Sequence, residues 1–354
     1  MLVMIAALAQ AVATVATLDL RWLVTLESPP AATPAYDVAT AYVPLREHGV
    51  LAIDLDRGSV RWQRDLTTTV TPAVGGDSAY VAVGEGVEAL EVATGQTRWQ
   101  TMLSSRVTSV TWDTGWLLCA GETGDLAALR GDDGEVMWRS TLGAQVVAGP
   151  APGLDRVYVG LADGRLVALD VATGRHAWER TLPGRITGLS SFDDQLIAGT
   201  TDNAVYSLSL SSGSQRWRWR VGGDVTGTAA SDDRHVYFVS RDNMLRAVDR
   251  GSGNLRWIVD LSTRPAAGPQ LFAGVVLVPL AAAVALFEPA NGSAIGTVAV
   301  SGELGTSPHV RLDVRPTAPR LVALTRDGRL QGFGARYEAP PAPLETLPGQ
   351  PVVP

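Results

Sequence analysis

Few residues of this chain have side chains suited to catalysis or metal binding. Their spacing matches no known catalytic or metal-binding pattern. Neighbouring carboxylates occur as Asp54 with Asp56 and as Asp132 with Asp133. Paired carboxylates can bind calcium, which prefers oxygen ligands. Each pair also stands in or beside a glycine-containing turn, where aspartate oxygens accept hydrogen bonds from nearby backbone N–H groups. Turn formation explains these pairs better than calcium binding does.

The histidines and the cysteine also lack partners at catalytic or metal-binding spacing. The four histidines, His48, His176, His235 and His309, are scattered, and none stands in a triad or zinc-ligand pattern. The single cysteine, Cys119, lies in the apolar run WLLCAGE, which predicts a small buried side chain. We therefore predict no catalytic residues, no metal site and no bound cofactor.

The sequence contains a regular repeat, and the structural elements of this repeat must position any functional site. Glycine is followed four residues later by tryptophan in six copies: Gly58/Trp62, Gly95/Trp99, Gly134/Trp138, Gly174/Trp178, Gly213/Trp217 and Gly253/Trp257. A seventh, degenerate copy has Gly292 followed by Gly296 where tryptophan is expected. Successive copies begin 37 to 40 residues apart, and a fixed period of this length is typical of repeat proteins.

Each period predicts four short strands, as residues 145–181 illustrate. The predicted strands are, in order, QVVAGPA, RVYVGL, RLVALDV and RHAWERT. Asp163-Gly164 separates the second from the third, and ATG separates the third from the fourth. Asp163-Gly164 predicts a two-residue hairpin turn with positive φ at both positions. The second and third strands are almost continuously apolar, which indicates that both sheet faces are covered. Four-stranded units that cover one another in this way form a β-propeller.

The two ends of the chain together predict an eighth blade. Trp22 lies 40 residues before Trp62 and marks a fourth strand without its first three, whereas residues 307–333 contain three strands without a fourth. We therefore predict one all-β domain, an eight-bladed β-propeller of four-stranded blades over residues 18–336. Pairing of residues 18–26 with the strand around 330–333 would close the ring by N- and C-terminal strands and remove an open edge.

We expect the repeated tryptophans to be structural. Each lies on an outermost strand, where wedge-shaped blades diverge and a large flat side chain can fill the gap. The glycine permits the tight turn that directs this strand. The predicted docking residues are Trp22, Trp62, Trp99, Trp138, Trp178, Trp217, Trp257, Gly58, Gly95, Gly134, Gly174, Gly213 and Gly253.

Composition and the terminal segments indicate the compartment and exclude some partners. The net charge of −7 and the absence of a basic block argue against nucleic-acid binding. Residues 1–17 are uncharged and contain AVA at 11–13, which predicts a secretory signal; an apolar first strand of a cytosolic protein is the alternative. The Pro-rich residues 337–354 predict an extended, mobile tail. We expect an exported monomer that does not span a membrane. It would be periplasmic or secreted, with association with the outer membrane as a further option.

The segment YVGLADGRLVALDVATGRHAWERTL (158–182) resembles the repeat of the quinoprotein-type, or PQQ-like, propeller family. In that family Gly-x-x-x-Trp is a tryptophan-docking motif, and the resemblance covers about residues 19–333. Size and blade number are closest to BamB, the outer-membrane assembly scaffold. The resemblance implies a non-enzymatic scaffold of the bacterial cell envelope that binds proteins, possible partners being the outer-membrane assembly machinery.

The resemblance also implies two alternatives, a PQQ-dependent quinoprotein dehydrogenase and a secreted propeller that binds carbohydrate or another small ligand. Quinoprotein dehydrogenases carry long insertions between blades, calcium ligands, a catalytic aspartate and often adjacent cysteines. This chain has almost minimal repeats and a single cysteine, Cys119. BamB proteins are anchored by a lipidated cysteine at the end of the signal, and Cys119 lies far inside the domain. Lipid anchoring therefore does not follow from the resemblance.

A candidate interaction surface follows from the constant register of the repeat. The positions seven residues after each tryptophan, or after Gly296, are Pro29, Thr69, Arg106, Gln145, Arg185, Asp224, Arg264 and Glu303. They precede innermost strands rich in small residues, so we expect a ring at one mouth of the central channel. Arg106, Arg185, Arg264, Asp224 and Glu303 could bind an acidic or mixed-charge protein. A solvated rim whose charges pair with one another is the alternative.

Overall fold

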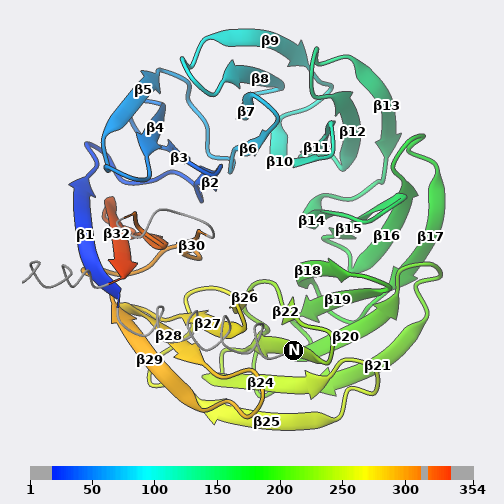
Figure 1. Ribbon diagram of the computed structural model, residues 1–354. Coiled ribbons are helices and arrows are strands. Elements are labelled where there is room, and N and C mark those ends of the chain that lie inside the picture. Colours follow the sequence, from blue (N-terminus) through cyan, green and yellow to red (C-terminus); the bar gives the residue numbers. More distant parts are fainter. Residues whose placement is uncertain (1–17, 312–317, 336–354) are drawn as a thin grey trace, which may run out of the picture.

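The computed structural model describes residues 18–311 and 318–335 and contains eight antiparallel four-stranded sheets arranged in a ring (Figure 1). The predicted secretory signal and Pro-rich tail lie outside the described residues. The strands nearest the centre of the ring are β2 (Ala35–Tyr36), β6 (Ala73–Gly75), β10 (Val107–Asp113), β14 (Val146–Pro152), β18 (Ile186–Phe192), β22 (Ala230–Ser231), β26 (Gln270–Phe272) and β30 (His309–Val310).

The second and third strands of each blade follow outward from the centre. The second strands are β3 (Thr40–Pro44), β7 (Ser78–Val83), β11 (Trp116–Gly121), β15 (Arg156–Leu161), β19 (Gln195–Thr200), β23 (His235–Val239), β27 (Val275–Pro279) and β31 (Leu321–Leu324). The third strands are β4 (Val50–Asp54), β8 (Gly86–Glu91), β12 (Asp125–Arg130), β16 (Arg165–Asp170), β20 (Ala204–Ser209), β24 (Met244–Asp249), β28 (Ala283–Phe287) and β32 (Arg329–Ala335).

The outermost strands form the perimeter of the ring. They are β5 (Val60–Arg64), β9 (Thr97–Met102), β13 (Val136–Thr141), β17 (His176–Thr181), β21 (Gln215–Arg220), β25 (Leu255–Asp260), β29 (Ala294–Ala299) and, from the other end of the chain, β1 (Leu18–Thr25). In the eighth blade the strand order is β1-β32-β31-β30. Trp22 of β1 is opposite Gly332, and Val24 is opposite Leu330. The all-β, eight-bladed propeller and its closure by strands from both ends are confirmed.

Burial follows the layers of the blade as the sequence pattern predicts. Strands β3 and β4 are buried at every position, whereas the outer strand β5 is largely exposed apart from Trp62. The buried apolar residues form eight clusters, and each cluster combines side chains of two adjacent blades. The hydrophobic effect therefore stabilises the ring through blade-to-blade packing.

The turn between β15 and β16 differs from the predicted two-residue type. Only Gly164 has positive φ there, at 88°, and its N–H donates to the carbonyl oxygen of Leu161 at 3.1 Å. This is an i-to-i+3 turn that ends in a left-handed residue. The prediction of positive φ at both Asp163 and Gly164 was therefore wrong. A pair with positive φ at both positions does occur at His48-Gly49, with φ of 71° and 81°.

Candidate functional site

The antiparallel strand order gives the propeller two distinct faces. In a four-stranded antiparallel blade, successive connections alternate between the two ends of the strands. The links from an outermost strand to the next blade and the turns between second and third strands therefore share one face, here called the rim face. The turns between first and second strands and the Gly-x-x-x-Trp turns share the opposite face, here called the motif face.

The repeated tryptophans lie between blades. In every case the indole Nε1 donates a hydrogen bond to a backbone carbonyl oxygen of the following blade. The pairs are Trp22 with Leu55, Trp62 with Val92, Trp99 with Gly131, Trp138 with Val171, Trp178 with Leu210, Trp217 with Arg250 and Trp257 with Pro289. The distances run from 2.7 Å at Trp138 to 3.2 Å at Trp22.

Each indole also contacts the glycine of the next copy of the motif. A Cβ added to Gly95 would lie 2.7 Å from Trp62, and one added to Gly292 would lie 2.6 Å from Trp257. The remaining pairs of this kind are Gly58 with Trp22, Gly134 with Trp99, Gly174 with Trp138, Gly213 with Trp178 and Gly253 with Trp217. These glycines all have positive φ, so glycine serves both the turn and the close approach of the indole. The stabilisation that these contacts provide stays a prediction.

The proposed ring of residues on the rim face has a repeated backbone contact. At six of the eight positions the carbonyl oxygen accepts the N–H of the first or second residue after the second strand of the next blade. These positions are Pro29, Arg106, Gln145, Arg185, Asp224 and Glu303. Next to Arg264, Pro265 forms an isolated antiparallel β-bridge with Leu280. Next to Asp224, Val225 forms the equivalent β-bridge with Ser240. Thr69 has no contact of this kind among the described residues.

The charges of the ring divide into paired carboxylates and unpaired arginines. Asp224 lies 4.0 Å from Arg241, and Glu303 lies 3.2 Å from Arg326. Arg106, Arg185 and Arg264 are exposed and make no ion pair within the described part of the chain. The carboxylates are therefore partly neutralised by neighbours, whereas the three guanidinium groups keep their donors free.

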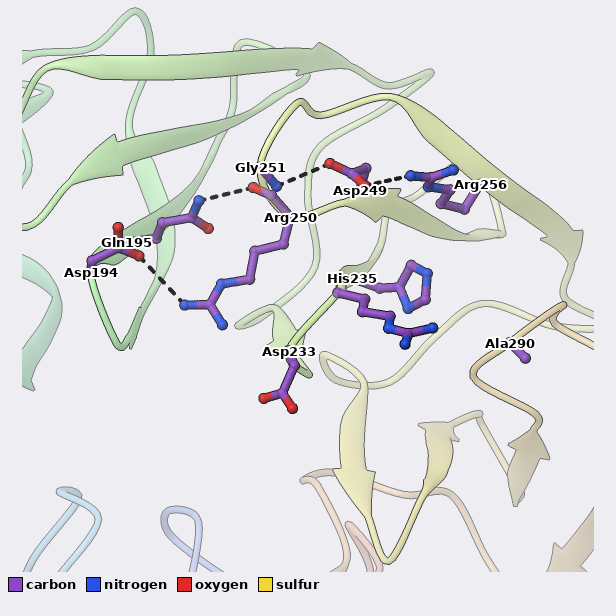
Figure 2. A pocket seen from close by; sticks show the side chains of 10 residues that line it. Asp194, Gln195, Asp233, His235, Asp249, Arg250, Gly251, Arg256 and Ala290 are labelled. Atoms are coloured by element: carbon purple, nitrogen blue, oxygen red, sulfur yellow. Dashed lines mark hydrogen bonds and ion pairs between the residues drawn. The ribbon is translucent and has the colours of Figure 1, made fainter. Parts of the chain in front are cut away.

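A hollow on the motif face was not predicted from the sequence. It has a volume of about 700 Å³ and is lined by residues of the fifth and sixth blades around Arg250, together with Ala290 of the seventh (Figure 2). The Arg250 guanidinium lies 2.7 Å from Asp193 and 3.5 Å from Asp194, and its backbone carbonyl oxygen accepts hydrogen bonds from Gln195 and Trp217. Because Arg250 directly follows an unremarkable strand ending in Asp249, no local pattern identifies it.

A small polar cluster stands at the edge of this Arg250 hollow. The hydroxyl of Tyr237 donates to Asp232 at 2.5 Å, and Nδ1 of His235 lies 3.4 Å from the same carboxylate oxygen. Burial alone would raise the pKa of Asp232, but the Tyr237 hydroxyl and two backbone N–H groups lower it below its usual value. The described lining residues include no serine, threonine or cysteine, so this Asp–His pair has no hydroxyl or thiol beside it among them.

One carboxylate of each acidic pair, Asp54 and Asp133, accepts backbone N–H groups within its turn, as the sequence indicates. Asp54 accepts the N–H groups of Asp56 and Arg57, each at 2.9 Å, and its second oxygen pairs with Arg61 at 2.7 Å. Within residues 18–311 and 318–335 no group of three His, Cys, Asp or Glu side chains could hold a metal ion.

Cys119 is enclosed in the interface between the second and third blades. Burial raises the pKa of its thiol to about 12, so the reactive thiolate form is disfavoured. The described part of the chain also contains no helix of a length and apolarity that could cross a membrane.

Eight four-stranded blades, with outer-strand tryptophans that contact the following blade, define a PQQ-like β-propeller. The family model described as outer membrane protein assembly factor BamB matches residues 5–112, 83–201 and 183–330. The chain belongs to this family.

Individual relatives agree with this assignment. BamB of Shewanella oneidensis is 35% identical over 82 residues, which is 22% of this chain and 21% of that protein. The chain thus matches about one fifth of the length of this curated relative. The structure of BamB from Moraxella catarrhalis superposes with a TM-score of 0.72 at 20% identity, over 90% of this chain and 99% of that one.

The fold is also shared with an enzyme. The quinohemoprotein alcohol dehydrogenase from Comamonas testosteroni superposes with a TM-score of 0.70 at 15% identity, over 96% of this chain and 79% of that one. The designed protein Ika8 superposes with a TM-score of 0.74 at 14% identity, over 88% and 98% of the two chains. Identities this low show a common fold and leave the activity to be argued from the site.

Proposed function

We propose that this protein is a non-enzymatic, protein-binding scaffold of the bacterial cell envelope. The single observation that carries the proposal is the set of three unpaired arginines, Arg106, Arg185 and Arg264, at one repeated register after alternate blades on the rim face. Arginine presents several donors in a planar fork and is favoured at protein interfaces that recognise carboxylates. Membership of the BamB family supports a partner in outer-membrane protein assembly.

The quinoprotein alternative is not favoured by the donors available in the described structure. The Asp54 carboxylate, which could have contributed to a calcium site, is already bound by turn N–H groups and by Arg61. Cys119 has no neighbouring cysteine and lies inside a blade interface. These residues do not fit a quinone with its calcium ion, and we derive no reaction step through such a group.

Partner capture from a cell-envelope extract tests the scaffold proposal. The intact propeller is expected to retain outer-membrane barrel assembly proteins, identified by mass spectrometry. The variant Arg106→Ala/Arg185→Ala/Arg264→Ala is expected to lose most of this capture with an unchanged melting temperature. A matched control is Arg57→Ala/Arg175→Ala/Arg234→Ala, because these arginines are exposed on the motif face and form no ion pair in the described structure. Equal capture by both variants would show that the rim is not the binding surface.

Export is a further part of the proposal, supported by the uncharged apolar start and by the family. Residues 1–13 are expected to be absent from the mature protein. Mass spectrometry of the native N-terminus measures this directly. Recovery of the protein from the cytosol with Met1 retained would contradict export.

A further inference from the structure

We propose that the motif face carries a second binding surface, which takes a basic side chain of an extended polypeptide segment. The surface is a hollow of about 540 Å³, here called the Leu154 pocket. Its apolar wall includes Pro152, Leu154, Phe192 and Leu210, and its acidic edge includes Asp113 and Asp193. It lies on the face opposite to Arg106, Arg185 and Arg264, so it is independent of the proposed rim.

Three consecutive blades contribute the pocket. Asp113 ends β10, Leu154 lies in the turn between β14 and β15, and Asp193 directly follows β18. The corresponding turns of the third and fifth blades use residues with positive φ, Thr114 with Gly115 and Asp193. Leu154 itself is fully exposed, at 102% of its reference area. A tight turn does not require leucine at its tip, so the side chain is not explained by the fold.

The exposed Leu154 side chain lies beside other apolar side chains that line the pocket, and together they form a surface that could bind an apolar group. A single apolar side chain on a surface is ordinary. Leu154, however, borders a concave surface shared with Phe192 and Leu210, where an incoming aliphatic chain would lose water on several sides. The stem of arginine or lysine is such an aliphatic chain, and a guanidinium can also lie over the face of an aromatic ring such as Phe192.

The charge of the pocket selects a cation. The Asp113 carboxylate makes no hydrogen bond or ion pair in the described structure, and the Asp193 side chain is 76% exposed and paired only with Arg250. No arginine, lysine or histidine is among the described residues that line this pocket. The Arg250 guanidinium at 2.7 Å partly neutralises Asp193, so the unpaired charge of the pocket is that of Asp113. A carboxylate or phosphate would be repelled by Asp113, whereas a basic head group would find it free to pair.

A neighbouring hollow indicates that the ligand is a chain segment and not an isolated cation. This second hollow has a volume of about 360 Å³ and shares Leu154, Asp193 and Leu210 with the Leu154 pocket. It extends along the motif face to Arg216 and Asp194, which pair with each other at 2.6 Å. Two adjoining hollows that share Leu154 suit successive side chains of an extended peptide.

The first experiment measures binding of a defined probe to the full-length protein. The probe is a fluorescently labelled peptide with the core Gly-Leu-Arg-Leu-Gly, and fluorescence anisotropy gives its affinity. We expect saturable binding that weakens as salt rises. Replacing the peptide arginine by the neutral isostere citrulline should weaken binding at least fivefold, and replacing it by glutamate should weaken it further. Equal affinity for the three peptides, or no saturable binding up to about 5 mM, would overturn the proposal.

Substitutions in the Leu154 pocket test whether the arginine peptide binds there. Asp113→Asn/Asp193→Asn and Leu154→Ser should each weaken binding of the arginine peptide at least fivefold. Asparagine tolerates the positive φ of 45° at Asp193, which limits strain in the double variant. The matched controls are Asp77→Asn and Val38→Ser, which alter turns between first and second strands in other blades and should leave the affinity unchanged. If pocket and control variants bind equally, the site is elsewhere.

The rim variant separates this inference from the proposed scaffold function. Arg106→Ala/Arg185→Ala/Arg264→Ala should leave the affinity for the arginine peptide unchanged, because these residues lie on the opposite face. Free arginine in place of the peptide should bind at least tenfold more weakly. Equal affinity for free arginine would overturn the extended segment as the ligand, whatever the outcome of partner capture at the rim.

Discussion

The indole of Trp178 lies against Gly213 of the next blade, and a Cβ on Gly213 would come within 2.6 Å of the indole Cε3 atom. The same indole donates its N–H to the carbonyl oxygen of Leu210 at 2.9 Å. Each such contact thus joins a tryptophan of one motif to a glycine of the next. Seven tryptophans are placed in this way, so the contact recurs at seven of the eight blade interfaces.

Removing one of these indoles should destabilise the propeller markedly. We expect Trp178→Ala to lower the free energy of unfolding by about 3–5 kcal/mol, the usual range for truncating a packed aromatic side chain. Urea denaturation followed by circular dichroism measures the change. Met102→Ala is a suitable control, because Met102 is an outer-strand side chain that is 58% exposed. A loss below about 1 kcal/mol at Trp178 would show that the indole is not docked.

Alanine substitutions at two glycines with similar backbone conformations can distinguish the cost of backbone strain from the cost of displacing an indole. Gly213 and Gly76 have φ of 66° and 56°, but a Cβ on Gly76 would meet no atom within 4 Å. Alanine at either position should cost about 1–2 kcal/mol of backbone strain. Gly213→Ala must also displace the Trp178 indole, so we expect at least about 1 kcal/mol of additional loss. Equal unfolding free energies for the two variants would exclude a role of Gly213 in docking.

Closure of the ring should be required for cooperative folding. Deleting residues 18–26 removes β1, exposes the edge of β32 and takes away the Trp22 contact with Gly58. We expect loss of a single thermal transition, together with aggregation through the open strand edge. A chain that begins at residue 18 is the control and should melt sharply. A sharp, unshifted transition in the deletion variant would contradict the closure model.

His309 should make the protein less stable in mild acid. Its ring stacks on Tyr36 with centroids 4.2 Å apart, and burial, with a contribution from Arg311, lowers the pKa of His309 to about 4, although Asp37 opposes this. The unfolded state, in which the pKa is near 6.5, therefore gains a proton first as pH falls. The stability conferred by the neutral ring is present above about pH 6.5 and is lost as pH falls toward 4.

The size of this effect can be measured with one substitution. Between pH 7.5 and pH 5 we expect the unfolding free energy of the wild type to fall by about 1–2 kcal/mol more than that of His309→Gln, after allowance for the partial exposure of the ring. Urea denaturation at the two pH values provides the comparison. Because the carboxylates titrate alike in both proteins, their contribution cancels. Parallel losses in the two proteins would mean that His309 is not responsible.

The degenerate seventh motif has a topological explanation. The blade that follows it takes β32 and β1 from opposite ends of the sequence, so no turn joins its third and fourth strands. No motif glycine is therefore available opposite Gly296, and an indole at that position would lack its usual counterpart. The break in the repeat and the closure of the ring are two consequences of the same arrangement.

The sequence by itself determined the number of blades, their strand order and the closure of the ring. These features depend on local patterns that recur every 37 to 40 residues, namely apolar runs, turn glycines and outer-strand tryptophans. The register of Arg106, Arg185 and Arg264 could be counted from the tryptophans for the same reason. A strictly repeated local pattern permits few other folds.

Only the tertiary structure decided which groups meet between blades. No local pattern shows that Trp178 contacts Gly213, 35 residues away, and not Gly174, four residues before it. The Leu154 pocket likewise needs Asp113, Leu154 and Asp193 from three blades. Turn residues like these tolerate many substitutions, so they leave no periodic signal in the sequence. Packing of adjacent blades brings them together, and that packing is a property of the closed ring.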